Sequence, residues 1–384
     1  MRALQFDRVI LFFVVAIAMS SCKHIPAANE SLPDGFLKED IKTVDSLAGA
    51  FMVKYNVPGL SFTISQSDSI KIERCYGYAD KGNNKLMAPG NRFRIASISK
   101  PFTATAIMQL IEQSKLHLQD KVFGKGMVLD TIYGSYPYKK WVEDITIEML
   151  LEHLAGGWGN DENDPMFAHP EMNQAKLIGW TLDSVPLQHE PGTHYQYSNF
   201  GFCVLGRVIE KITGMKYEDY VHQNILQPCN ITDMQVGGNT LSEQLPGEVQ
   251  YYDKQEDPYA MNVSRMDSHG GWIATPTDLV KFVMRVDKFP QKPDILKQAT
   301  LDTMFSAPSV NSGYAKGWSV NKQDNYFHGG GLPGLVSILV RAHDGFCWAA
   351  IVNTRAEGDF SLDLDHLMWN IRKAIKQWPD IEVK

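Results

Sequence analysis

The 384-residue sequence lacks the features of several large classes of protein. It has no internal repeat and no low-complexity tract, which excludes a solenoid or a largely disordered chain. Its 37 basic and 44 acidic residues give a formal net charge of −7, and no basic cluster stands out. We therefore expect no nucleic-acid partner and no polybasic contact with a membrane. A chain of this length can bury a full hydrophobic core in one large or two ordinary domains.

Cysteine is scarce, and its pattern argues against cross-links and metal sites. Cys75, Cys203, Cys229 and Cys347 have no close spacing, and each lies in an apolar strand or helix pattern. We expect these four residues to be small buried hydrophobic side chains and not disulfides or structural zinc ligands. The segment 189–194, HEPGTH, resembles a zinc-binding helix only superficially, because Pro-Gly interrupts it. The sequence therefore predicts no metal and no organic cofactor.

Long hydrophobic runs are also absent, apart from one near the N-terminus. Residues 9–19 are apolar and follow two arginines, a stretch too short to span a bilayer and typical of a signal peptide. It ends in Met-Ser-Ser-Cys22, which resembles the lipobox of bacterial lipoproteins. We predict a signal peptide at 1–21, lipidation of Cys22, and a tether over 22–36. The protein would then be exported, face the periplasm or cell exterior, and touch the membrane only through its lipid. An ordinary cleaved signal with an incidental cysteine is the alternative.

Hydrophobic periodicity predicts a sheet built from both ends of the chain. Helices are expected over 37–55, 98–115, 146–155, 199–213, 217–226 and 276–287 and from 364 onwards, and strands over 59–65, 71–80, 317–321, 325–329, 334–342 and 346–354. The fold class is therefore α/β (α+β type). Residues 37–98 and 301–384 form an antiparallel sheet domain flanked by helices, and the mainly helical residues 99–300 are inserted into it. We expect the site where these two parts meet.

The first candidate for chemistry is a serine close to a lysine. Ser97 and Lys100 form one of three Ser-x-x-Lys pairs, and this pair alone opens a helical pattern. Pro101 is tolerated only in the first turn, so both side chains share one face with Cβ atoms about 5–6 Å apart. A helix cap would explain the serine, but the usual capping box has Glu or Gln three residues later. A lysine whose pKa is lowered by burial can instead be the base for a serine nucleophile. A neighbouring tyrosine is a second candidate base, because the cation stabilises phenolate.

Two further segments carry polar residues suited to the same chemistry. Tyr197-Ser198-Asn199 precedes a helical pattern, and of the fifteen tyrosines only Tyr197 has an asparagine two places later. The segment 328–330, His-Gly-Gly, precedes an apolar strand. Glycine there lets the backbone approach a ligand and present its N–H groups.

These three motifs, in this order, resemble those of the serine β-lactamase and penicillin-binding-protein-like family. The branch that looks most similar contains class C β-lactamases, D-alanyl-D-alanine carboxypeptidases and related esterases. The resemblance implies that Ser97 is the acylated nucleophile and that Lys100 and Tyr197 share the general-base and proton-return role. It implies that Asn199 holds Lys100 and a substrate amide. It also implies an oxyanion site between the backbone N–H groups of Ser97 and Gly331.

The third motif departs from the β-lactamase pattern. His328, which we count among the catalytic residues, stands where β-lactamases usually carry the lysine of Lys-Thr-Gly. The resemblance implies that Gly330 borders the substrate. A histidine is mostly neutral at pH 7, so a cationic anchor for a substrate carboxylate is missing. Family members with histidine here are often peptidases or esterases. We expect anionic substrates to bind weakly at pH 7 and better near pH 5.5, as His328 protonates.

The loop around residue 160 also departs from the family, which usually has Thr-Ser-Gly in the preceding segment. We interpret Asp161, Glu162 and Asp164 as solvated surface and not as a cation site. The sequence thus predicts an exported serine hydrolase that forms an acyl-enzyme with a small-molecule or peptide substrate, such as a D-amino-acid peptide or ester. A true class C-like β-lactamase and a penicillin-binding or sensor module without turnover are the alternatives. The sequence leaves the oligomeric state open.

Overall fold

A computed structural model describes residues 35–160 and 164–380. The predicted signal peptide, Cys22 and residues 22–34 of the predicted tether lie outside this part of the chain. Within it, no helix combines the length and the hydrophobicity needed to cross a bilayer.

The predicted helices and strands occur along the chain in the predicted order. The helices are α1 Lys38–Tyr55, α2 Ser99–Glu112, α3 Ile147–Leu151, α4 Gln174–Ser184, α5 Asn199–Thr213, α6 Tyr217–Val221, α7 Pro276–Val283, α8 Gln298–Met304 and α9 Phe360–Ala374. The strands are β1 Gly59–Gln66, β2 Ser69–Asp80, β3 Lys85–Leu86, β4 Phe93–Arg94, β5 Gln235–Val236, β6 Trp272–Ala274, β7 Ser319–Val320, β8 Tyr326–Leu332, β9 Leu335–Arg341 and β10 Phe346–Val352. The structure thus adds the helices α4 and α8 and the short strands β3 to β6 to the predicted elements.

The main sheet joins strands from both ends of the chain, which confirms the predicted fold class. Its order is β3-β2-β1-β10-β9-β8-β7, and its pairs are antiparallel. The N-terminal strand β1 lies beside the C-terminal strand β10, with Leu60 opposite Val352. A small second sheet, β4-β6-β5, lies within the region between the two ends.

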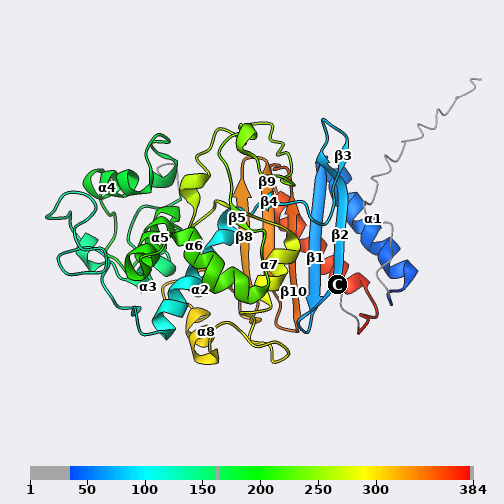
Figure 1. The fold of residues 1–384 in the computed structure, drawn as a ribbon. Coiled ribbons are helices and arrows are strands. Elements are labelled where there is room, and N and C mark those ends of the chain that lie inside the picture. The colour runs from blue at the N-terminus through cyan, green and yellow to red at the C-terminus, as the bar shows by residue number, and fades with distance from the viewer. Residues whose placement is uncertain (1–34, 161–163, 381–384) are drawn as a thin grey trace, which may run out of the picture.

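The sheet separates two hydrophobic cores. On one face α1 and α9 pack against each other and cover the strands, as the blue and red helices show at the right of Figure 1. Phe62, Trp348 and Val340 belong to this core. On the other face lie α7 and the helices on the left of Figure 1, whose core includes Phe102, Phe202 and Trp272. The central strands β1, β9 and β10 therefore bury both faces, which explains their almost continuous hydrophobic sequences.

Helix bounds follow local sequence signals closely where those signals are strong. The helix α5 spans the predicted residues 199–213, because Ser198 caps its start and Gly214 ends it in a left-handed conformation. The predicted helix over 217–226 is instead α6 followed by a π-helical turn at His222–Leu226. The helix α7 packs on β1 and β10 of the main sheet, although its residues fall in the predicted helical region. The division of the chain at residues 98 and 300 stays a prediction.

The four cysteines of the described chain are buried and free, as predicted.

Candidate active site

Ser97 lies in a tight turn that leads directly into α2. The turn Ala96–Ile98 is a 3-10 helix, and α2 starts at the next residue. Ala96 has a φ of 48°, in the left-handed region that residues other than glycine seldom occupy. Such strain persists only where surrounding contacts hold it. Strand β8 packs against this turn and holds the serine in place.

The side chain of Ser97 does not cap α2. The N-cap residue is Ile98, and no side chain caps that end of the helix. Instead, Ser97 Oγ lies 3.0 Å from Nζ of Lys100. The structure therefore brings together the serine and lysine that the sequence predicts on one face.

Lys100 is fully buried and has three polar neighbours. Its Nζ lies 3.0 Å from Oγ of Ser97, 2.7 Å from Oδ1 of Asn199 and 3.1 Å from the carbonyl oxygen of His269. Burial lowers the pKa of Lys100 well below its usual value, although the negative charge of Asp164 acts in the opposite direction. A lowered pKa increases the fraction of neutral amine, which is the form that accepts a proton.

These neighbours determine where the lone pair of neutral Lys100 points. A neutral amine has two N–H donors and one lone pair. Oδ1 of Asn199 and the carbonyl oxygen of His269 can only accept, so they take the two N–H groups. The hydroxyl of Ser97 can donate, and the lone pair is the remaining position on the nitrogen. The arrangement sets Lys100 to receive the proton of Ser97.

Tyr197 completes this group from the segment before α5. Its side chain is hydrogen-bonded to Ser97, and Nζ of Lys100 lies 4.7 Å from the centre of its ring. Burial raises the pKa of the Tyr197 phenol. The phenol therefore keeps its proton, and the geometry favours Lys100 over a Tyr197 phenolate as the base.

Asn199 connects Lys100 to two further polar side chains. Its Nδ2 donates to Oδ2 of Asp164 at 2.8 Å and to Oδ1 of Asn160 at 3.0 Å. Asp164 is only 4% exposed, so the interpretation of this residue as solvated surface is wrong. It was misread because the segment is polar and irregular, whereas tertiary contacts bury the carboxylate beside the predicted catalytic group. Asp161 and Glu162 lie outside the described residues.

His328 lies in β8, with its ring centre 6.3 Å from that of Tyr197. Its Nε2 lies 3.1 Å from the hydroxyl of Tyr314, and its Nδ1 lies 2.7 Å from the carbonyl oxygen of Gly329. Burial and the nearby charge of Lys100 lower the pKa of His328 to about 3. The expected protonation of His328 near pH 5.5 is therefore wrong, because the sequence does not reveal that the ring is buried beside a second basic group.

The glycines of β8 let the strand approach the turn that carries Ser97. A Cβ at Gly330 would come within 2.3 Å of the carbonyl oxygen of Ile95. The hydroxyl of Ser337, on β9, donates to that same carbonyl at 2.9 Å. At Gly331 a Cβ would meet open space. Since β7 pairs only with residues 326 and 327 of β8, residues 328–332 form an edge of the main sheet where a substrate can lie.

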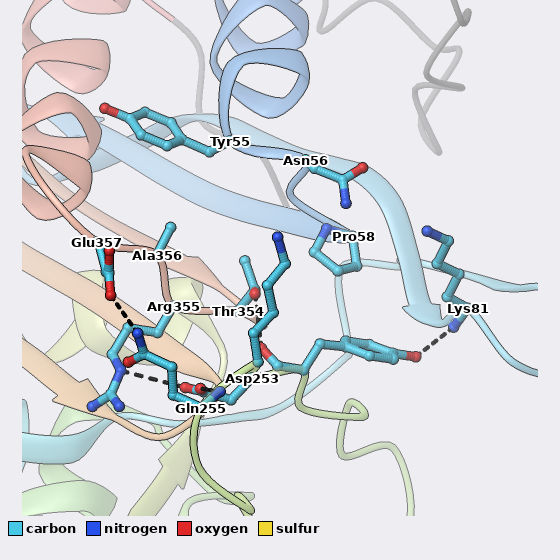
Figure 2. A pocket seen from close by; sticks show the side chains of 12 residues that line it. Tyr55, Asn56, Pro58, Lys81, Asp253, Gln255, Thr354, Arg355, Ala356 and Glu357 are labelled. Carbon is cyan, nitrogen blue, oxygen red and sulfur yellow. Dashed lines mark hydrogen bonds and ion pairs between the residues drawn. The ribbon is translucent and has the colours of Figure 1, made fainter.

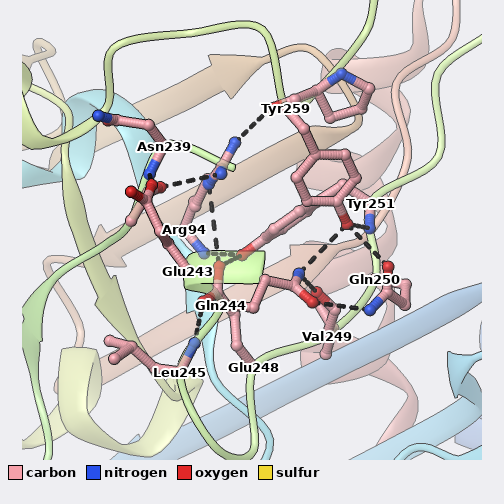
Figure 3. Close-up of polar contacts among 12 residues, drawn as sticks. Arg94, Asn239, Glu243, Gln244, Leu245, Glu248, Val249, Gln250, Tyr251 and Tyr259 are labelled. Atoms are coloured by element: carbon pink, nitrogen blue, oxygen red, sulfur yellow. Dashed lines mark hydrogen bonds and ion pairs between the residues drawn. The ribbon is translucent and has the colours of Figure 1, made fainter. Parts of the chain in front are cut away.

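A buried polar network supports the strand β4, which precedes the turn (Figure 3). The guanidinium of Arg94 donates to the carbonyl oxygens of Pro258 at 2.5 Å and Gly238 at 3.2 Å. Its backbone N–H donates to the hydroxyl of Tyr251, which in turn donates to Glu248. Arg94 is 1% exposed, and it ties the chain three residues before Ser97 to two distant loops.

Two cavities lie at other positions on the described surface. One of about 550 Å³ lies on the α9 side of β8, between apolar residues such as Phe327, Ile338 and Trp369. Its lining includes Asp365, whose pKa is raised by burial, and no basic side chain. The other, of about 430 Å³, lies between the end of α1 and the segment after β10 (Figure 2). Neither is lined by Ser97, Lys100 or Tyr197.

Sequence reasoning missed four residues that surround the predicted catalytic group: Asn160, Asp164, Tyr314 and His153. The ring of His153 packs on Tyr197 with ring centres 4.2 Å apart, and its Nδ1 accepts from the backbone N–H of Ser198. Each lies in an irregular segment or at a helix end, where no periodicity indicates its direction. Within residues 35–160 and 164–380, no group of three or more His, Cys, Asp or Glu side chains is placed to hold a metal ion.

Comparison with known proteins identifies the class of protein that this fold and group of residues define. The sequence model of the family described as Beta-lactamase matches residues 44–372, most of the chain. The chain therefore belongs to the Beta-lactamase family.

Two relatives show how far the similarity extends. Protein flp of Staphylococcus aureus (strain MRSA252) is 24% identical over 327 residues, covering 82% of this chain and 63% of the relative. Penicillin-binding protein 4* of Bacillus subtilis (strain 168) is 26% identical over 315 residues, covering 73% of this chain and 64% of the relative. The chain thus spans less than two thirds of the length of these relatives.

Solved structures share the fold. D-amino acid amidase from Ochrobactrum anthropi SV3, in complex with D-phenylalanine, has a TM-score of 0.73 and 23% identity, covering 88% of this chain and 99% of the amidase. The octameric penicillin-binding protein homologue from Pyrococcus abyssi has a TM-score of 0.69 and 21% identity, covering 88% of this chain and 79% of the homologue.

Proposed function

We propose that this protein is a serine hydrolase that forms an acyl-enzyme on Ser97 with a small amide or ester substrate. The observation that carries the proposal is the contact of fully buried Lys100 Nζ with Ser97 Oγ at 3.0 Å. A serine hydroxyl needs such a base to be nucleophilic at neutral pH.

In the proposed reaction, Ser97 Oγ attacks the carbonyl carbon while its proton moves to neutral Lys100. The carbonyl oxygen becomes an oxyanion, which the backbone N–H groups of Ser97 and Gly331 stabilise at the edge of β8. The tetrahedral intermediate then collapses and expels the amine or alcohol. The leaving group takes up a proton through the hydroxyl of Tyr197, which Lys100 reprotonates.

Water completes the cycle by the reverse sequence. It attacks the acyl carbon and loses a proton to the neutral Lys100–Tyr197 pair. The ester bond to Ser97 Oγ breaks, the serine recovers its proton, and the carboxylic acid product leaves. No redox step is involved, and each protein group ends in its starting protonation state, because water replaces the proton that left with the amine or alcohol.

The charge around the site favours a neutral substrate. His328 stays neutral because its pKa is lowered to about 3. A β-lactam or a D-Ala-D-Ala peptide carries a carboxylate, which here lacks a fixed cation at β8. We therefore infer an amide or ester of a D-amino acid, in line with the fold shared with D-amino acid amidase.

A second candidate is a penicillin-binding module that acylates without turnover, since one relative is a penicillin-binding protein. The two functions differ in the lifetime of the acyl-enzyme. Intact-mass measurements on protein mixed with a penicillin, a D-Ala-D-Ala peptide, a D-phenylalanine amide and a p-nitrophenyl ester distinguish them. A hydrolase releases product from the amide or ester and returns to the free mass, whereas a penicillin-binding module retains the penicillin adduct.

A fluorophosphonate probe tests the nucleophile directly. We expect one adduct, on Ser97, and loss of both the adduct and ester turnover in Ser97→Ala. A matched control is Ser99→Ala, because the Ser99 hydroxyl donates to the carbonyl oxygen of Ala96 and not to Lys100. Labelling at another residue, or turnover that survives in Ser97→Ala, contradicts the assignment.

We also propose that the protein is exported and anchored by a lipid on Cys22. The support is the sequence of residues 1–22, a short apolar run that ends in a lipobox-like segment.

A further inference from the structure

Asp164 contacts the predicted catalytic group through Asn199. Its Oδ2 accepts from Nδ2 of Asn199 at 2.8 Å, and Oδ1 of Asn199 accepts from Lys100 at 2.7 Å. Lys100 in turn contacts Ser97, so Asp164 can act on the serine through the amide and the lysine. Asp164 and Asn199 are 4% and 5% exposed, so water does not readily replace these bonds.

Both oxygens of Asp164 accept hydrogen bonds, and this requires a carboxylate. Oδ1 accepts from the backbone N–H of Met166 at 2.9 Å and caps the short helix Pro165–Phe167, while Oδ2 accepts from Asn199. Because a carboxylate can only accept, the amide nitrogen of Asn199 must face Asp164 and its oxygen must face Lys100. Asn160, the other partner of Nδ2, cannot enforce this choice, since its own amide can donate or accept.

The segment after Asp164 is held in place by Arg265. The guanidinium of Arg265 donates to four carbonyl oxygens, those of Met166, Ala168, His169 and Met172, at 2.6 to 3.2 Å. The same segment of chain that carries Arg265 supplies the carbonyl of His269 to Lys100. Arg265 therefore ties the segment that carries Asp164 to the segment that contacts the base.

We propose that Asp164 is a positioning residue that fixes the Asn199 amide and thereby directs the lone pair of Lys100 at Ser97. If the Asn199 amide turned over, its NH₂ group would face Lys100 and would donate to that lone pair. The lone pair would then be unavailable to Ser97, although every side chain stayed in place. This inference rests on the proposed function, because it concerns the same base.

The substitution Asp164→Asn tests the proposal without a change of shape. An asparagine cannot accept from both Met166 and Asn199, and it also removes a negative charge that raises the pKa of Lys100. We expect the maximal rate of fluorophosphonate labelling of Ser97 to fall roughly 10- to 100-fold, the effect of one hydrogen bond to a charged group. We also expect the acidic limb of the pH–rate profile to move down by about one pH unit, since Lys100 protonates less readily.

Other titratable groups face Lys100 and are not expected to produce this limb. Burial and neighbouring cations lower the pKa values of His153, His269 and His328, and burial raises that of Tyr197. These shifts keep the four groups neutral near neutral pH, so we assign the acidic limb to protonation of Lys100.

Two further variants separate positioning from general loss of structure. Asp278→Asn is the matched control, because Asp278 is also a buried capping carboxylate, on α7, with its contacts to Thr275. It should lower thermal stability without moving the acidic limb. Adding Asn160→Asp to Asp164→Asn returns an acceptor-only group to Nδ2 of Asn199, and should recover at least about tenfold of the lost rate.

The outcomes distinguish this inference from the proposed function. Wild-type protein that is not labelled on Ser97 refutes the proposed function itself. Labelled wild type with an unchanged rate and limb in Asp164→Asn refutes only the positioning role. If Asp164→Asn does not fold, the double variant Asp164→Asn/Asn160→Asp is compared with the wild type. An acidic limb at the wild-type pH and a labelling rate within twofold of the wild type support the proposal. A double variant that folds but labels no faster than about 1% of wild type overturns it.

Discussion

The neutral state of His328 makes a quantitative prediction about anionic ligands. With the usual pKa of about 6.5, a histidine is about 9% protonated at pH 7.5 and about 90% at pH 5.5, a tenfold change. His328 has a pKa of about 3, so its protonated fraction at pH 5.5 is only about 0.3%. A carboxylate ligand, which is ionised at both pH values, should therefore gain nothing from His328 on acidification.

The assay is binding to a variant that cannot react. We would measure the Kd of a fluorescent anionic D-peptide for Ser97→Ala at pH 7.5 and pH 5.5, and repeat both measurements in Ser97→Ala/His328→Gln. Lys100 lies close to the serine and also titrates, so the absolute change with pH is not informative. The second variant retains Lys100 and removes only the imidazole.

The two variants should show the same pH dependence within about twofold, because His328 contributes no charge in this range. If Ser97→Ala binds the peptide about tenfold more tightly at pH 5.5, and the His328→Gln variant does not, then the imidazole is protonated. That result would refute the assignment of a neutral His328 and reopen the case for carboxylate substrates.

Three further predictions concern the base, the stability of the fold and the N-terminus. Lys100→Ala and Tyr197→Phe should each lower the rate of Ser97 acylation at least roughly 100-fold. The double variant should lose little more, because the two groups act on one proton. Additive losses of the acylation rate, measured by stopped-flow labelling, contradict a shared role. Burial and the neighbouring carboxyl of Asp68 raise the pKa of Asp287 to about 8, so the folded state keeps a proton that the unfolded chain releases above about pH 4. The free energy of unfolding should therefore fall as the pH rises from 5 to 8. Measured by urea unfolding, this fall should be smaller in Asp287→Asn than in the wild type by at least about 1 kcal/mol. If the free energy of unfolding falls equally in both proteins, the carboxyl pair of Asp287 and Asp68 is not the source of the fall. The mature protein should begin at a lipidated Cys22 and partition into detergent, whereas the Cys22→Ala variant should be released or left unprocessed. A soluble wild-type protein in which mass spectrometry finds an unmodified Cys22 contradicts the lipid anchor.

The parts of the molecule that sequence predicts well are those fixed by local rules. The bounds of α5 agree with the periodicity because Ser198 and Gly214 mark its ends. The sheet formed by both chain ends follows from apolar strand patterns, and its antiparallel order confirms the fold class. The contact between Ser97 and Lys100 follows from helical spacing alone, since residues three apart share one face.

The parts that sequence does not predict are those fixed by contacts between distant segments. Nothing local distinguishes Asp164 from the polar residues before it, because its burial depends on Arg265, about one hundred positions later. The pKa of His328 likewise depends on Lys100 and on a packed environment that only the folded chain supplies. Local patterns thus predict which residues can react, whereas the tertiary structure determines their charge.

That distinction bears on how Lys100 acts as the proposed base. An isolated lysine has a pKa near 10.4 and is a cation at neutral pH, which cannot accept a proton. At the centre of the helical core, Lys100 is surrounded by two acceptors that remain satisfied when the amine is neutral, the Asn199 amide and the His269 carbonyl. In the cation, a third N–H can donate to Ser97 Oγ, and the serine hydroxyl then no longer donates to the nitrogen. Desolvation therefore opposes the cation, whereas the negative charge of Asp164 favours it, so that the lysine can still hold the proton during turnover. A base in this position must be poised between the two states, and the orientation of one amide, fixed by one carboxylate, is what keeps it there.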